Sequence, residues 1–107
     1  MGEYERMASA EDVEFGRELE LGHHQTLVPV LIRAVEAEPL REHRRCLLML
    51  ALYRCGRQLE ALRTSLHLRE TLAELGREPT AETKELEAAI ALERPELDWT
   101  DPDAIAN

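Results

Sequence analysis

Two glycines divide the first half of this chain at a spacing that limits what it can fold into. Gly22 and Gly56 lie 34 residues apart, and each follows one helical run and precedes another. The flanking residues align as well, since Leu21-Gly22-His23-His24 matches Cys55-Gly56-Arg57-Gln58 in order. A period of 34 residues is the length of a repeat built from two antiparallel helices. The spacing predicts stacked helix pairs, an architecture that mostly binds other proteins.

The apolar periodicity predicts helices throughout and no strand. The predicted helices span residues 3–21, 26–38, 40–55 and 58–75, with a fifth that follows Thr80 as N-cap and ends before Pro95. We therefore expect an all-α fold of stacked antiparallel helix pairs. It should be a tetratricopeptide-like right-handed helical repeat of about five helices.

The predicted helix ends follow from glycine, proline and threonine chemistry. Gly22, Gly56 and Gly76 each follow a helical run, where a left-handed C-terminal residue is least costly as glycine. In the second helix, Thr26 is a favourable N-cap, which would place Pro29 in the first turn.

The third helix is expected to be the most buried. Residues 46–53 are apolar all round, so neighbouring helices must cover it on nearly every side. Cys46 and Cys55 point to opposite faces of this helix and cannot bridge each other, which favours reduced thiols. Beyond the last helix, Leu97 and Trp99 are expected to anchor the tail on the last helix pair. Residues 1–99 then form one domain, and residues 100–107 a frayed end.

Charge and hydropathy exclude several classes of function. The net charge of −9 disfavours direct nucleic-acid binding, because phosphate contacts need clustered cations. No apolar run is long enough for a membrane span, and the acidic N-terminus does not match a signal peptide, so we expect a cytoplasmic protein. The arginines nevertheless cluster between residues 41 and 69. They form either solvated helix faces, a basic strip for an acidic protein partner, or a DNA contact.

No constellation of side chains predicts catalysis or metal binding. The adjacent His23 and His24 have no partners at ligand spacing, so surface or capping roles are expected. His43 and Cys46 share a helical face and would need His67 from the next helix to hold a metal. Ser65 and His67 lie about 200° apart on a helix. We expect no enzyme, no cofactor and no metal.

Several motifs, in order, resemble a known family. The longest is residues 47–62, LLMLALYRCGRQLEAL. Others are LGHH with LVP at residues 21–29, EPLRE at 38–42, LGREP at 75–79 and LEAAI at 86–90. Together they are similar to the bacterial transcriptional activator domain of the Streptomyces antibiotic regulatory protein family, over roughly residues 4–99.

The resemblance implies a fold of stacked tetratricopeptide-like helix pairs, self-association and contacts with the transcription machinery. Full-length members place a winged-helix DNA-binding domain before this one, and 107 residues leave no room for it. The chain is then a stand-alone member, a truncated derivative or an excised domain. Ser65, beside Thr64, stands where the family often has an aromatic residue, which weakens packing or opens a small groove.

Two functions from different classes follow. The first is a protein-interaction module in bacterial transcriptional regulation, without its DNA-binding domain, whose partner is RNA polymerase or a DNA-binding regulator. Its predicted partner-binding residues are Arg44, Arg45, Arg54, Arg57 and Arg63. The alternative is a structural self-association domain, or a remnant of a larger regulator, in which Met7 and Phe15 of the first helix form a homodimer.

Overall fold

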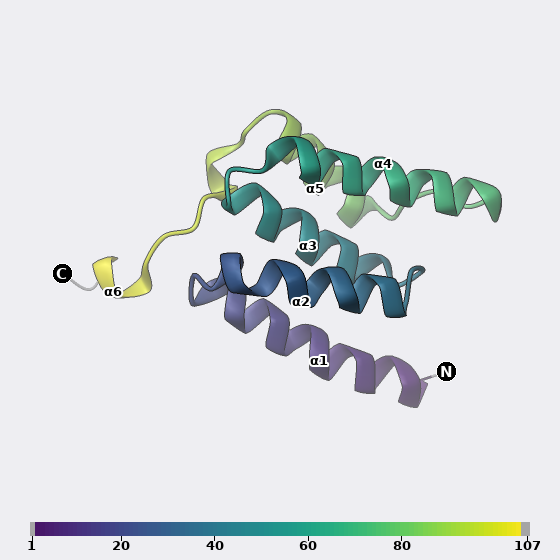
Figure 1. The fold of residues 1–107 in the computed structure, drawn as a ribbon, viewed down its shortest axis with the longest axis horizontal. Coiled ribbons are helices and arrows are strands. Elements are labelled where there is room, and N and C mark those ends of the chain that lie inside the picture. The colour runs from purple at the N-terminus through teal and green to yellow at the C-terminus, as the bar shows by residue number, and fades with distance from the viewer. Residues whose placement is uncertain (1, 106–107) are drawn as a thin grey trace.

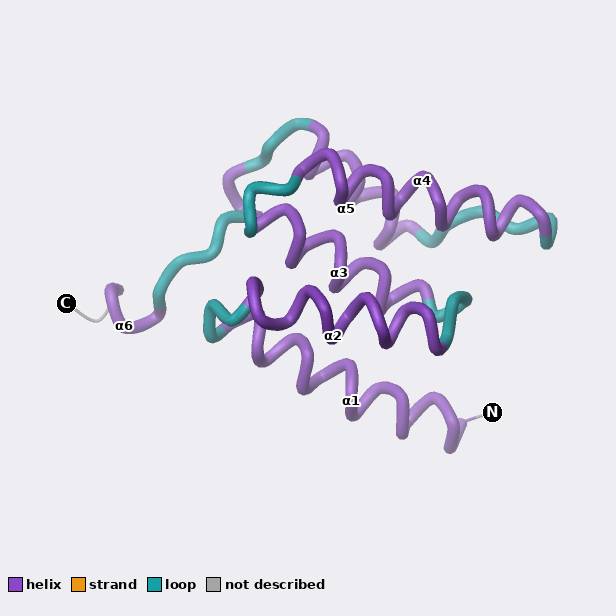
Figure 2. Tube along the Cα trace, viewed as in Figure 1, coloured by secondary structure: helices purple, strands orange, loops and turns teal. Residues whose placement is uncertain are grey.

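The computed structural model describes residues 2–105, and the side chains of residues 10–103. Five long helices are followed by a 3₁₀ turn and a short helix (Figures 1 and 2). Their bounds are α1 Gly2–Glu20, α2 His24–Ala37, α3 Glu42–Arg54, α4 Gln58–Glu74, α5 Ala81–Ala91, η1 Pro95–Leu97 and α6 Pro102–Ile105. Residues 2–105 contain no strand. The predicted all-α fold of antiparallel helices is confirmed.

Gly22 and Gly56 close equivalent turns, so the 34-residue period is a structural one. Their φ angles are +84° and +77°. At the first turn the amide of Gly22 donates to Leu19 O at 3.1 Å, and at the second the amide of Gly56 donates to Tyr53 O at 2.9 Å. These contacts belong to the Schellman motif, which needs a left-handed residue after the helix.

The predicted start of the second helix is wrong by two residues. The helix begins at His24, because the turn closed at Gly22 leaves only His23 to join it to α1. The His23 carbonyl accepts hydrogen bonds from the Leu27 amide at 3.0 Å and the Thr26 hydroxyl at 3.1 Å. Thr26 therefore bonds a carbonyl instead of capping amides, and Pro29 lies inside the helix on its exposed side.

Helix α3 lies at the centre of the molecule, as predicted. It packs against α1, α2, α4 and α5, and Figure 1 shows it between α2 and α4. Met49 and Ala51 are completely buried. Phe15 of α1 packs against the same core. Cys46 is buried and Cys55 half-buried, and both are free thiols.

A buried ion pair joins α1 to α3. Arg44 Nε donates to Asp12 Oδ1 at 2.9 Å, and both side chains are less than a tenth exposed. The same guanidinium lies 3.1 Å from Glu11 and 3.4 Å from Glu38, and its central carbon is 5.9 Å from the centre of the Phe15 ring. The charge of Arg44 is thus fully matched by carboxylates within the fold.

A second polar cluster joins α3 to α5. The Thr80 hydroxyl accepts from the Thr83 amide, so Thr80 is the N-cap that the sequence predicts. The carboxylate of Glu42 accepts from the Thr80 amide at 2.6 Å and from the Thr80 hydroxyl at 2.8 Å. Burial raises the pKa of Glu42, but the hydrogen bonds from Thr83 and Thr80 outweigh it, so that pKa lies below its usual value.

Leu97 packs against the core, but Trp99 does not lie on the last helix pair, which corrects the prediction for Trp99. Helix α5 ends at Ala91, and the chain crosses to the turn between α1 and α2. There the indole Nε1 of Trp99 donates to Glu20 O at 2.8 Å. A left-handed residue, Glu93 with φ +51°, follows α5 at the point where the chain leaves that helix. The prediction that residues 100–107 are frayed stays a prediction; residues 102–105 form the short α6.

The buried pair of Asp12 and Arg44 should be essential for stability. We expect Asp12→Ala to lower the free energy of unfolding by about 3 kcal/mol, because it removes the buried carboxylate beside Arg44 and leaves only the more exposed Glu11 and Glu38. The matched control is Glu60→Ala, which removes the partner of the exposed Arg57 and should cost less than about 1 kcal/mol. Urea unfolding measures both. Equal losses in the two variants would contradict the assignment.

Candidate protein-binding groove

A groove runs over α3 between α2 and α4. It encloses a cavity of about 330 Å³ and is called here the central groove. Its lining residues are Ile32, Leu48, Leu52, Glu60, Arg63 and Thr64. They come from all three helices, and α2 and α4 each pack along α3.

The central groove has an apolar floor and a polar wall. Leu48 and Leu52 of α3 form the floor and are almost fully buried, while Ile32 of α2 is 39% exposed. On the α4 side, the Thr64 hydroxyl donates to the Glu60 carbonyl at 2.9 Å. An apolar floor beside a polar wall is the chemistry with which grooves hold amphipathic segments.

Weaker packing or a small groove was expected where Ser65, beside Thr64, replaces the family's aromatic residue. Thr64 lines the central groove, as the prediction of a small groove requires. Ser65 is completely buried and donates to Glu87 of α5, which also holds Arg69 at 2.9 and 2.6 Å. Hydrogen bonding between α4 and α5 therefore takes the place of aromatic packing there.

The five arginines of the predicted basic strip do not form one surface, because two of them are interior. Arg44 and Arg45 are only 4% and 3% exposed. Arg45 Nε donates to Pro39 O, and its Nη1 lies 3.1 Å from His67 Nδ1. Burial lowers the pKa of Arg45. Both residues stabilise the fold and are closed to a partner.

Arg57 and Arg63 lie at the surface of α4. Arg57, which precedes the first turn of α4, donates twice to Glu60, at 2.9 and 2.6 Å, and this pair is solvent-exposed. Arg63 lines the central groove. Among the described side chains, Arg63 forms no ion pair within 4.0 Å. It therefore adds an exposed positive charge beside the carboxylate of Glu60 in the groove lining.

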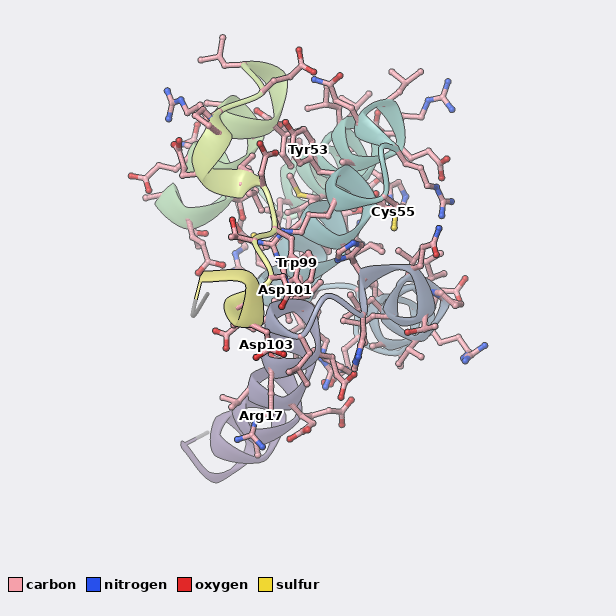
Figure 3. The ribbon with its side chains drawn as sticks, turned by 90° about the vertical axis from the view of Figure 1, so that its left-hand side faces the viewer. Arg17, Tyr53, Cys55, Trp99, Asp101 and Asp103 are labelled. Carbon is pink, nitrogen blue, oxygen red and sulfur yellow. The ribbon has the colours of Figure 1, made fainter. Side chains whose placement is uncertain are left out.

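Arg54 fastens the C-terminal segment instead of facing a partner. Its Nε donates to Leu97 O at 2.9 Å and its Nη1 to Leu19 O at 3.4 Å. The Trp99 ring lies against Gly22 and meets His24 edge to face at 6.0 Å. We call the surface formed by Glu20, Gly22, His24 and Arg54 the tail dock. Figure 3 looks onto this end of the molecule, where Tyr53 and Trp99 are labelled.

The side chains weighed as metal ligands have other partners in the described part of the chain. His43 Nδ1 lies 2.8 Å from Glu82, and His67 meets Arg45. The Thr83 hydroxyl lies 3.3 Å from the Cys46 sulfur, and burial raises the pKa of that thiol to about 12. Among the described residues no three His, Cys, Asp or Glu side chains are grouped as metal ligands, and none of the helices is long and apolar enough to cross a membrane.

Residues 3–91 match the sequence pattern of the bacterial transcriptional activator domain. The chain belongs to this family. The regulatory protein AfsR of Streptomyces griseus is 49% identical over 68% of this chain, and the regulatory protein DnrI of Streptomyces peucetius is 38% identical over 83%. The resemblance to the Streptomyces antibiotic regulatory protein family is confirmed. The chain spans only 8% and 33% of the length of these two relatives.

A solved structure supports the same fold. Mycobacterium tuberculosis EmbR, in complex with a low affinity phosphopeptide, superposes with a TM-score of 0.84 at 25% identity. The match covers 88% of this chain and 25% of that one. Family and fold together place the domain among proteins of transcription regulation.

The sequence predicted a small groove near Thr64 but not its position over α3 between α2 and α4, and it did not predict the tail dock. A local signal existed for the groove floor, since Leu48 and Leu52 are four residues apart on one face of α3. No local signal existed for the tail dock, because Trp99 and Glu20 are 79 residues apart.

Gly22 should be needed for the contact with Trp99, not only for its turn. A Cβ at Gly22 would lie 2.6 Å from Trp99 Cζ2, whereas a Cβ at Gly56 would meet nothing within 4 Å. Alanine costs about 1 kcal/mol of backbone strain at both positions. We therefore expect Gly22→Ala to expose Trp99 and shift its fluorescence to longer wavelength, and Gly56→Ala to leave it unchanged. A similar shift in both variants would refute the contact.

The tail dock should weaken in acid. Burial, followed by the charges of Arg54 and His23, lowers the pKa of His24. Since the folded pKa is below the unfolded value of about 6.5, the neutral imidazole is favoured in the fold. The stabilisation from neutral His24 is present above the unfolded pKa and is lost as the pH falls below that value and through the folded pKa. Between pH 7.5 and 5.5 the wild type should lose more unfolding free energy than His24→Gln. Parallel curves would exclude this role.

Proposed function

We propose that this domain is a protein-interaction module of transcription regulation that holds a partner segment in its central groove. The observation that carries this is the apolar floor of Leu48 and Leu52 beside the exposed charge of Arg63. The partner is RNA polymerase or a DNA-binding regulator, in the cytoplasm. Residues 1–99 form the interacting domain, and residues 100–107 its frayed end.

The chemistry of the groove favours an amphipathic segment with an acidic side. Apolar side chains would bury against Leu48, Leu52 and Ile32, which gives affinity roughly in proportion to the area removed from water. A carboxylate would pair with Arg63 or compete with Glu60 for Arg57. Such rim charges set orientation and association rate more than affinity.

Direct DNA binding and catalysis are not part of this proposal. The net charge of −9 opposes phosphate contacts, and two of the arginines are interior. DNA contact is assigned to a separate domain or partner. The EmbR complex contains a phosphopeptide, which supports protein partners for the family, although this chain covers only a quarter of that protein.

Self-association through the first helix has less support. Phe15 packs into the core of its own chain and lies near the Arg44 guanidinium. Met7 lies outside the described side chains. The homodimer formed by these two residues therefore stays a prediction.

Reversing the charge of Arg63 in the groove and of Arg57, the ion-pair partner of the groove residue Glu60, should weaken partner binding without unfolding the domain. We expect Arg57→Glu with Arg63→Glu to reduce recovery of RNA polymerase subunits or a winged-helix protein on the order of tenfold, a change of about 1.4 kcal/mol. The measurement is a pull-down from a lysate of the source organism, quantified by mass spectrometry. Arg54 is left intact because it fastens the tail.

The matched control is Arg33→Glu, an exposed charge reversal on α2 outside the groove lining. It should bind like the wild type, and urea unfolding should show that all variants are folded. Unchanged recovery with the double variant would reject the groove as the site. Recovery of the bait chain alone would favour self-association over partner binding.

A further inference from the structure

The C-terminal segment is attached to the body like a bound peptide. Its carbonyl at Leu97 accepts from Arg54, and its Trp99 both donates to Glu20 O and covers Gly22. These contacts join the C-terminal segment to the turn between α1 and α2, which lies 79 residues earlier in the sequence. The tail dock is therefore a receptor surface for a Leu-Asp-Trp segment, residues 97–99.

The connection to α5 is exposed and carries a strained residue. Residues 92–96 are all solvent-exposed. The amide of Glu93 donates to Ile90 O at 3.2 Å and that of Arg94 to Ala89 O at 2.9 Å, which is the glycine-type helix ending found after α1, α3 and α4. Here glutamate occupies the left-handed position, at φ +51°. A glutamate is less favourable there than glycine.

We infer that the tail dock also receives the Leu97–Trp99 segment of a second copy of this chain, so that two copies associate by exchanging tails. The occupant is fixed by the structure, because the segment that fits the dock is seen bound to it. An exchanged pair keeps every contact of the dock while the hinge at Glu93 is free to relax. Exchange of an identical element is a low-cost route to a dimer.

Mass action then governs the balance between the two forms. In a monomer whose own tail fills the dock, that tail is present at a high local concentration. Exchange should therefore appear only at high protein concentration or after the tail has left the dock. This association uses the end of the molecule that carries the α1–α2 turn. It does not involve Arg57 or Arg63, so the groove variants should exchange tails like the wild type.

Two complementary variants test the exchange. Trp99→Ala has an open dock but no indole, and Gly22→Ala has an indole but a blocked dock. Each alone should be monomeric. Their mixture should show a rise in mean mass toward twice that of one chain by light scattering. It should also show a shift to shorter wavelength in the emission of Trp99, which is the single tryptophan of the sequence.

Gly56→Ala is the matched control for this mixture. Nothing blocks the dock of Gly56→Ala, and the chain's own tail already fills it. Mixing Gly56→Ala with Trp99→Ala should therefore change the emission of Trp99 far less than mixing Gly22→Ala with Trp99→Ala does. Circular dichroism should show that all three variants are helical. A mixture of Trp99→Ala and Gly22→Ala that keeps monomer mass and merely sums the two spectra at several hundred micromolar would overturn the proposal.

The hinge gives a second, independent test in the full chain. Glu93→Gly removes the strain of the closed form and should lower the dimer fraction. Glu93→Val increases that strain, because a β-branched residue is least tolerated at positive φ, and should raise the dimer fraction. Light scattering over a concentration series measures both. Equal dimer fractions, or the opposite order, would reject Glu93 as the hinge of exchange.

Discussion

The need to cover α3 on all sides is the constraint on which the rest of the structure depends. Its residues 46–52 are apolar around the whole helix, and no single neighbour can bury them. Four helices therefore pack on it, two of them along opposite sides. The central groove is a consequence, because α2 and α4 both reach α3 and leave Leu48 and Leu52 as a floor between them.

The same constraint explains why the most conspicuous charges of the sequence are interior. Arg44 and Arg45 precede the buried Leu48 and Met49 by four residues, so they share the faces that point to the core. Burying a guanidinium is costly unless it is paired, and Asp12 of α1 pairs with Arg44. The helical spacing contained this signal, whereas the count of arginines between residues 41 and 69 did not.

Local chemistry in the sequence was enough to predict most of the fold. The left-handed glycines at positions 22, 56 and 76 end three helices, and Thr80 caps the fifth. Prediction failed where a choice depended on distant parts of the chain. The start of α2 was set by how tightly the turn at Gly22 closed, against the capping preference of Thr26. The course of the tail was set by a receptor surface 79 residues away.

The candidate partner-binding residues were likewise only partly predictable from the sequence. The five arginines predicted to bind a partner were chosen by position along the sequence, and the fold gives them three different tasks. Arg44 and Arg45 are paired inside, Arg54 holds a carbonyl of the tail, and Arg57 and Arg63 stay at the surface. A linear sequence shows which charges are present, but which of them meet solvent depends on how α1, α2 and the tail pack around α3.

Gly22 meets two requirements, whereas Gly56 meets one. Both provide a left-handed turn, but only Gly22 also leaves the space that Trp99 fills. Helix α1 packs on α2 and α3, and its last carbonyls add to its attachment. Arg54 binds the carbonyl of Leu19, and Trp99 binds that of Glu20. The 34-residue period accounts for the turn at Gly22, and the packing of Trp99 accounts for the absence of a side chain at that position. Whichever copy of the chain supplies Trp99 therefore also holds the end of α1 in place.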